Sequence, residues 1–285
     1  MTDPALSRQD DSPSDSAQAH DENAWSNRLM QTGKGWLQDL MRSYVFLTRL
    51  PLTRSDDDLP SRPISQSMRG FPVIGALIGA MGGIAYLLGD LIGLTPLLSA
   101  SLGVLVLTAL TGAMHEQALV NITGMANSAA PGMKGIVFVV LLLLIKIACL
   151  VQVGSLNRGA PLVVILLISA SSVARAAMVG AAYFLQGQPD GADSGGNPEN
   201  GACAAVPQTQ FMQAIIIAAL VVTLCLALGQ GFSIAIASIL AAILAGAALT
   251  TWMNSDIMQP ADALGAVIPV SETAFLLTAT ALLAQ

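Results

Sequence analysis

The chain has 285 residues, of which 54% are hydrophobic and only 11% are charged, with a mean hydropathy of +0.66. A soluble domain carries about 25% charged residues, so this composition excludes an ordinary soluble protein. The formal net charge of −6 says little about partners, because many of the acidic residues lie in the N-terminal tail and in one loop. No nucleic-acid partner is expected. The apolar residues fall in runs of about 20, the length that spans a bilayer. The sequence therefore predicts an all-α, polytopic helical membrane protein.

The predicted elements divide the chain into a tail and a membrane domain. Residues 1–33 are polar and predict a disordered tail, ahead of a single integral membrane domain over residues 34–285. Residues 35–51 repeat apolar side chains with a helical period and charges between them, which favours an interfacial helix along the membrane surface. About seven transmembrane helices follow. They are expected near residues 71–89, 95–114, 135–154, 161–185, 211–228, 232–251 and 264–283.

The first span carries three glycines spaced by four, Gly75, Gly79 and Gly83. This spacing places small residues on one stripe and predicts the close approach of a neighbouring helix. Six basic residues lie between residues 34 and 69, just before the span, and the positive-inside rule puts that end of the chain in the cytoplasm. Counting crossings then places the polar segments 115–134, 187–209 and 252–263 on the same side. One cytoplasmic face is therefore expected to gather the polar motifs.

The stretch between the second and third spans, residues 112–127, reads GAMHEQALVNITGMAN. His115 is one of only two histidines in the chain, and Glu116 follows it. Three further positions share one helix face, because neighbours three or four apart lie together. These positions hold Gln117, Asn121 and Gly124. Carboxylates are the usual ligands of Mg²⁺ in proteins, so the stretch has the spacing of an acidic metal site without the acids.

Two cations lie inside predicted spans, Lys146 in the third and Arg175 in the fourth. A charge at mid-bilayer costs roughly 2.5–3.5 kcal/mol unless it finds a partner or reaches the interface. Such residues mark functional sites by default, and a buried structural pair is the alternative. We favour a functional role for Arg175 and leave both interpretations open for Lys146. Glu272, in the last span, is one of the few acids available there.

Several segments together resemble the cobalamin synthase family, the adenosylcobinamide-GDP ribazoletransferases, from about Met41 to the C-terminus. The similar segments are FLTRLP at 46–51, RGFPVIGALIGA at 69–80, residues 144–146, SxxARAA at 171–177, and DALGA at 262–266 with Glu272. The family signature GGxHxDGLADxxDG reads GAMHEQALVNITGM here, so His115 and the spacing are kept. Its three aspartate positions are Gln117, Asn121 and Gly124. A family segment ending in MRDSRxG has no counterpart, and the family's GGxTGD reads IMQPAD, which keeps Asp262.

The resemblance implies a Mg²⁺-dependent reaction late in cobalamin (vitamin B12) biosynthesis. The ribosyl hydroxyl of α-ribazole, or of its 5′-phosphate, attacks the β-phosphorus of adenosylcobinamide-GDP, and GMP leaves. The resemblance assigns Asp262 as a metal ligand, with Gln117 and Asn121 at degenerate ligand positions. It makes His115 or Glu116 a base or a positioning group. The residues that would hold phosphate are Arg49, Arg69, Lys146 and Arg175.

The resemblance also implies a place in the bacterial cytoplasmic (inner) membrane, with the lipid bilayer and other cobalamin-assembly enzymes as partners. Two alternatives stay open at this point. One is a catalytically degenerate homologue that still binds a corrinoid or partner subunits. The other is a small-solute transporter or scaffold, for which Lys146, Arg175 and Glu272 inside the spans would be suitable. The clustering of the remaining motifs on one face argues against a transporter, whose polar groups more often lie near mid-membrane.

Overall fold

The computed structural model describes residues 33–50, 63–125, 131–156, 159–185, 205–227, 232–252 and 260–284. The chain divides into two compact units, Met1–Gln38 and Asp39–Gln285, and the helical bundle belongs to the second. The predicted tail lies outside the described residues, apart from Gly33. The same holds for most of the predicted loop at 187–209.

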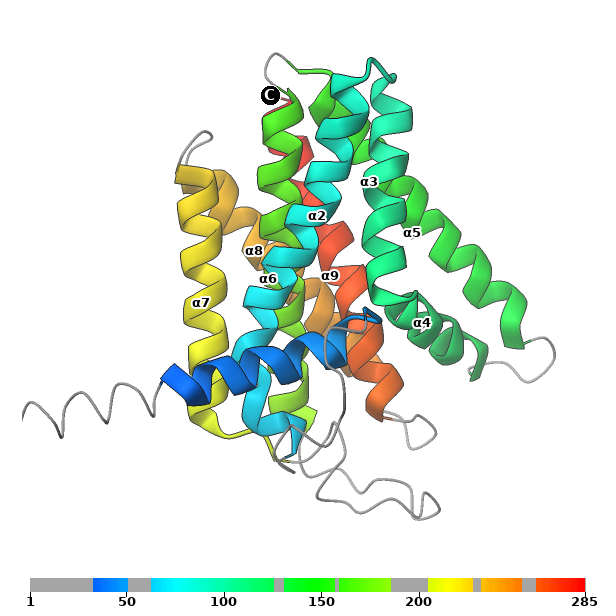
Figure 1. Ribbon diagram of the computed structural model, residues 1–285. Helices are drawn as coiled ribbons and strands as arrows, with labels where there is room; N and C mark the ends of the chain where they lie inside the picture. The colour runs from blue at the N-terminus through cyan, green and yellow to red at the C-terminus, as the bar shows by residue number, and fades with distance from the viewer. Residues whose placement is uncertain are drawn as a thin grey trace, which may run out of the picture. The chain divides into compact units, whose positions relative to one another are not determined.

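Every regular element in the described ranges is a helix, which confirms the predicted all-α class (Figure 1). The elements are η2 (Ile64–Gly70), α2 (Phe71–Leu91), α3 (Pro96–Thr111), α4 (Met114–Met125), α5 (Pro131–Gly154), α6 (Gly159–Leu185), α7 (Gln208–Ala227), α8 (Phe232–Trp252) and α9 (Pro260–Leu283). A helix over residues 33–47 comes before them, where the sequence predicted one over 35–51. Its placement along a membrane surface stays a prediction.

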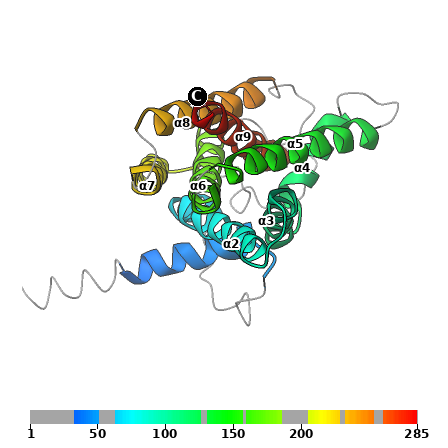
Figure 2. The same cartoon turned by 90° about the horizontal axis from the view of Figure 1, so that it is seen from above.

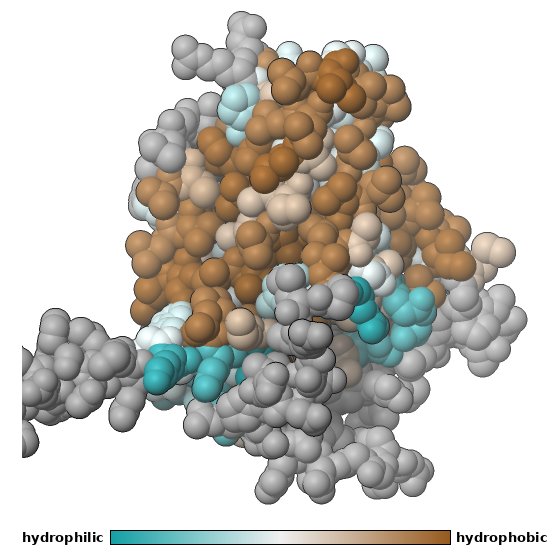
Figure 3. Space-filling model, viewed as in Figure 1, coloured by the Kyte–Doolittle hydropathy of each residue, from teal (hydrophilic) through white to brown (hydrophobic). Residues whose placement is uncertain are grey.

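Six helical segments are long and apolar enough to cross a membrane. They are Ile64–Leu91, Met133–Gly154, Gly159–Leu185, Gln208–Cys225, Ser233–Thr251 and Ala261–Leu283. The second predicted span corresponds to α3, which with the start of α4 forms a pair bent by 84° and makes a seventh crossing if it is counted as one span. Apolar side chains cover most of the face seen in Figure 3, and hydrophilic ones gather toward one end. The polytopic helical class is thus confirmed.

Helix α6 is the centre of the bundle, and it packs against α2, α7, α8 and α9 (Figure 2). Its contact with α2 depends on the glycine stripe predicted from the sequence. A Cβ atom added at Gly79 would collide with the Leu167 carbonyl, and one at Gly83 would lie 2.8 Å from Val164 Cγ1. The glycines therefore let the two helix backbones meet closely, as expected.

The chain turns sharply between α3 and α4, at Gly112 and Ala113. Both residues adopt positive φ, 61° and 55° respectively. The amide N–H of Ala113 donates to the Thr108 carbonyl at 2.9 Å, which closes the last turn of α3. Helix α4 then packs against α5 and α9, where Leu119 and Ile122 are buried with alanines of α9. The turn therefore lays the polar stretch of the sequence against the start of α9 instead of leaving it as a free loop.

Candidate functional site

Two buried cations share one carboxylate inside the bundle. Glu272 of α9 accepts from Lys146 Nζ of α5 at 2.7 Å and from Arg175 Nη1 of α6 at 2.5 Å. Ser171 Oγ donates to the same carboxylate at 3.0 Å. Arg175 is 2% exposed and Lys146 5%, so both charges are almost fully removed from solvent. Both carboxylate oxygens of Glu272 thus accept hydrogen bonds. The cluster of Lys146, Arg175 and Glu272 nevertheless holds one more positive than negative charge.

Gly75 of α2 makes room for this cluster. A Cβ atom at position 75 would lie 2.5 Å from Arg175 Cδ and 2.5 Å from the Ser171 carbonyl oxygen. The same carbonyl accepts a hydrogen bond from Arg175 Nη1 at 3.0 Å. Glycine is therefore required at this position by the path of the arginine side chain as well as by helix packing.

A small polar cavity of about 20 Å³ adjoins the cluster. It is lined by polar residues of α3, α4, α5, α6 and α9 together with apolar ones, and the polar residues are Thr108, Thr111, His115, Glu116, Lys146, Arg175 and Glu272. His115 is 5% exposed. Three buried polar atoms of this lining have no hydrogen-bond partner, namely His115 Nε2, Glu116 Oε2 and Arg175 Nε. The structure thus brings both predicted catalytic residues to the two buried cations, although they are far apart in the sequence.

The predicted metal-ligand positions form a second group on a different face of α4. Gln117 Nε2 donates to Asn121 Oδ1 at 2.9 Å. Asn121 Nδ2 in turn donates to both carboxylate oxygens of Asp262, in the first turn of α9, at 3.2 Å each. Gly124 follows one turn further along α4. We call Gln117, Asn121 and Asp262 the amide relay.

The amide relay has the donor chemistry for a hard cation but not the charge. Among the described residues, no group of three or more His, Cys, Asp or Glu side chains is placed to hold a metal ion. Mg²⁺ is often held by one or two carboxylates together with substrate phosphates. Asp262 supplies one carboxylate, and the two amides supply neutral carbonyl oxygens. The relay fits such an ion only if the Asn121 amide turns, because its NH₂ group now faces the carboxylate.

The remaining two predicted phosphate ligands lie outside both groups. Arg69 forms an ion pair with Asp39, with Nε and Nη2 at 2.7 and 2.6 Å from the same oxygen. Ser67 Oγ donates to the other oxygen of that carboxylate at 2.9 Å. Arg49 is exposed beside the α3–α4 turn, where its backbone N–H donates to the Leu110 carbonyl at 3.0 Å. The structure therefore does not bring Arg49 or Arg69 into the buried ion cluster.

Sequence reasoning missed Ser171 and Asp39 as members of these networks. A signal existed for Ser171, because it stands four residues before Arg175 on the same helix and therefore on the same face. None existed for Asp39, whose partners follow 28 and 30 residues later.

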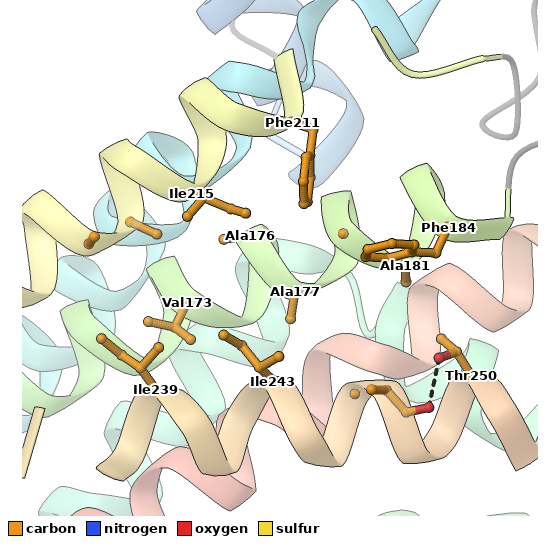
Figure 4. Close-up of a pocket in the computed structure, with 15 residues that line it drawn as sticks. Val173, Ala176, Ala177, Ala181, Phe184, Phe211, Ile215, Ile239, Ile243 and Thr250 are labelled. Carbon is orange, nitrogen blue, oxygen red and sulfur yellow. Dashed lines mark hydrogen bonds between the residues drawn. The ribbon is translucent and has the colours of Figure 1, made fainter. Parts of the chain in front are cut away.

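A larger cavity, of about 200 Å³, lies between α6, α7 and α8 (Figure 4). Val173, Phe211 and Ile243 are among its lining residues, one from each helix. The hydroxyl of Thr250, also in the lining, is bonded within its own helix to the Ala247 carbonyl at 2.8 Å. No predicted site residue lines this cavity, whereas four of them, His115, Glu116, Lys146 and Arg175, line the smaller one.

The fold and these contacts define the class of protein. It is a helical membrane protein with a buried ion cluster beside a carboxylate–amide group. A family model described as cobalamin-5-phosphate synthase matches residues 39–123 and 125–280. The chain belongs to this family, as the resemblance in the sequence predicted.

Curated relatives extend this finding. Proteins of Brucella ovis, Brucella canis and Brucella melitensis, each named adenosylcobinamide-GDP ribazoletransferase, are 38% identical to this chain over 85 residues. That match covers 30% of this chain and 33% of each relative. The chain thus aligns with about a third of the length of these relatives. No solved structure matches the chain.

Proposed function

We propose that this protein is an adenosylcobinamide-GDP ribazoletransferase, which joins adenosylcobinamide-GDP and α-ribazole, or its 5′-phosphate, with release of GMP. The observation that carries the proposal is the contact between Asn121 and Asp262. These residues stand 141 positions apart, in two separate family motifs, yet their side chains meet at 3.2 Å. The same helix α4 presents His115 and Glu116 to the buried cations. Two family motifs that are far apart in the sequence are therefore neighbours in the fold.

The proposed reaction makes specific demands on charge. A ribosyl hydroxyl oxygen forms a bond to the β-phosphorus, the bond to the leaving GMP breaks, and the hydroxyl proton must be taken up. Negative charge on the transferred phosphoryl group and on GMP must be neutralised where it develops. Lys146 and Arg175 line the same cavity as His115, and we assign them to the phosphate groups. His115 or Glu116 takes the proton or holds the hydroxyl in position.

Mg²⁺ is part of this proposal. Asp262 would hold it together with the carbonyl oxygens of Asn121 and Gln117 and oxygens of the substrate diphosphate. When bound, the ion would neutralise phosphate charge as a Lewis acid. Because the relay carries one carboxylate where the family signature adds three aspartates, we expect it to bind Mg²⁺ weakly without the substrate.

We further propose that the protein lies in the bacterial inner membrane with α4 and the start of α9 on the cytoplasmic side. Six basic residues lie between residues 34 and 69, just before the first span, which favours that orientation. Helix α4 and the start of α9 lie toward one end of the bundle (Figure 1). Other cobalamin-assembly enzymes are the partners that this position would allow.

The test is direct turnover. The purified protein in detergent is incubated with adenosylcobinamide-GDP, α-ribazole and Mg²⁺, and release of GMP and formation of the corrinoid product are measured. We expect turnover that His115→Ala or Asp262→Ala abolishes. Turnover that survives both substitutions would contradict the assignment of the site.

The amide relay favours one second candidate, a catalytically degenerate relative that binds a corrinoid without converting it. The observation behind it is that the Asn121 amide donates to both oxygens of Asp262, the carboxylate that a cation would need. Equilibrium binding of adenosylcobinamide-GDP separates the two candidates. Binding without GMP release, at any Mg²⁺ concentration, would favour the degenerate relative.

A further inference from the structure

We propose that Lys146 and Arg175 form an occluded site for a diphosphate anion, and that α4 is a lid which closes this site by inserting Glu116 in place of the anion. The proposal rests on the proposed function only for the identity of the natural ligand. Binding of a diphosphate by the cluster requires neither a corrinoid nor turnover.

Charge is the first reason. The charged side chains that line the polar cavity are Lys146 and Arg175, which are cationic, and Glu272 and Glu116, which are acidic, with the imidazole of His115 beside them. Glu272 is bonded to both cations and to Ser171. Glu116 is the second acid, and its Oε2 is buried without a hydrogen-bond partner. Glu116 therefore balances the charge of the cluster without being bonded into it.

The position of Glu116 in the fold is the second reason. Lys146, Arg175 and Glu272 belong to α5, α6 and α9, which are long enough to span a membrane. Glu116 belongs to α4, which has only 12 residues. A movement of α4 would therefore withdraw one negative charge and leave the two cations with Glu272 alone. The vacated place has the charge that an anion needs.

Size is the third reason. The cavity of about 20 Å³ has room for about one water molecule. A phosphate group cannot reach Lys146 or Arg175 unless part of the lining moves. The other polar lining residues are fixed in long packed helices. They are Thr108 and Thr111 of α3 and the three charged residues of the spans, Lys146, Arg175 and Glu272. His115 and Glu116 are the polar lining residues that α4 carries, and α4 begins at the sharp turn.

The turn itself is the fourth reason. Among the described residues, Ala113 is the one non-glycine residue with a positive φ, which is 55°. The φ of Gly112, just before it, is also positive, at 61°. A residue with a Cβ atom is disfavoured in this region, so the bent conformation holds backbone strain that a straighter turn releases. The inner face of α4 also carries His115 Nε2 and Glu116 Oε2 without partners. Contacts of Leu119 and Ile122 with Ala263 and Ala266 keep the lid closed.

The first experiment measures the balance between Glu116 and the anion. Binding of radiolabelled inorganic pyrophosphate to the full chain in detergent is followed by equilibrium dialysis, without Mg²⁺. We expect Glu116→Gln to bind pyrophosphate about tenfold more tightly than the natural chain, because the competing carboxylate is gone. Asp90→Asn is the matched control, since it removes one acid from an exposed position at the end of α2. It should leave the affinity unchanged.

Removing a cation must have the opposite effect. Arg175→Gln in the Glu116→Gln background should abolish the gain, and Lys146→Gln serves the same purpose if the arginine variant does not fold. Equal affinity of the Glu116→Gln variant and the natural chain would overturn the proposal. So would a gain that persists without either cation, or one that Asp90→Asn reproduces, because the gain would then reflect net charge alone.

The second experiment measures the opening of α4. Thr111 lines the cavity and is 3% exposed, so Thr111→Cys in a chain whose Cys149, Cys203 and Cys225 are replaced by alanine reports access to the cavity. A Cβ atom at Gly265 would lie 2.6 Å from Ala118 Cβ, so Gly265→Ala pushes α4 away from α9. We expect it to raise the rate of maleimide labelling about tenfold. Gly246→Ala is the control, because its Cβ would lie 2.9 Å from Ser271 Oγ in the α8–α9 contact.

An unchanged labelling rate in Gly265→Ala, or an equal rise in Gly246→Ala, would overturn the lid. A protein that releases no GMP but shows tighter pyrophosphate binding in Glu116→Gln retains the occluded anion site and loses the proposed reaction. A protein that turns over but shows no effect of Glu116→Gln on pyrophosphate binding retains the reaction and loses the occluded site.

Discussion

The two faces of α4 meet charged groups in opposite ways, one in a buried cluster and the other in a half-buried network. The inner face meets two cations and a carboxylate that are almost fully buried and joined at 2.5–2.7 Å. The outer face meets a single carboxylate, Asp262, through neutral amides at 3.2 Å. On the inner face Glu116 lies beside the ion cluster with its Oε2 unbonded, whereas the outer relay satisfies its own hydrogen bonds. The difference shows that one short helix contacts ion pairs on one face and an amide–carboxylate hydrogen-bond network on the other.

The largest expected effect comes from removing the shared carboxylate. Glu272→Ala leaves the buried Lys146 and Arg175 without their ion-pair partner, which should destabilise the protein by about 3–5 kcal/mol. Thermal unfolding of the purified protein in detergent measures this change. Asp262→Ala removes the carboxylate of the outer face and should cost far less, because its partner is a neutral amide. Equal losses from both substitutions would contradict the contrast between the faces.

The second prediction concerns Gly75, which borders the inner cluster. Gly75→Ala places a methyl group against Arg175 and the Ser171 carbonyl, and we expect a loss of about 1–3 kcal/mol in stability together with loss of GMP release. Gly83→Ala introduces a similar contact with Val164, a neutral side chain. It should lower stability by a comparable amount and spare the activity of the molecules that remain folded. Similar specific activities in the two variants would show that Arg175 tolerates displacement.

The third prediction restores charge to the outer face. Asn121→Asp places a second carboxylate against Asp262, so without Mg²⁺ the two acids should repel each other and lower the melting temperature. With Mg²⁺ the variant should gain stability, by about 2.7 kcal/mol at a concentration 100 times the dissociation constant. Gln66→Asp, which adds an acid at an exposed site in η2, is the control. A melting temperature of Asn121→Asp that does not respond to Mg²⁺ would rule out the relay as a cation site.

The smallest effect is expected at the turn that separates the two faces. Ala113→Gly relieves a positive φ at a cost in chain entropy, so we expect a net stabilisation of at most about 1 kcal/mol. Gly112→Ala should do the reverse, because its Cβ would lie 2.5 Å from Arg49 Cγ and its φ is also positive. Thermal unfolding of the two variants should shift in opposite directions. Shifts in the same direction would mean that backbone conformation does not govern this turn.

Much of the fold was predictable because it depends on local sequence. Apolar runs of bilayer length identify the spans, and the spacing of Gly75, Gly79 and Gly83 identifies the face of α2 that meets α6. The bend after α3 was not predictable. Positive φ at Ala113 is unusual for a residue with a side chain, and no pattern in GAMHE marks it.

The candidate site divides in the same way. The sequence by itself determined which residues are candidates for the site: a histidine, two cations inside spans, and amides where the family signature has aspartates. Only the tertiary structure decided their partners, because Glu272 is 97 residues from Arg175 and 126 from Lys146. A charge inside a membrane span must find a counter-charge, but local sequence does not say which one. That choice is made by packing, which brings α5, α6 and α9 together and turns α4 so that its two faces meet different neighbours.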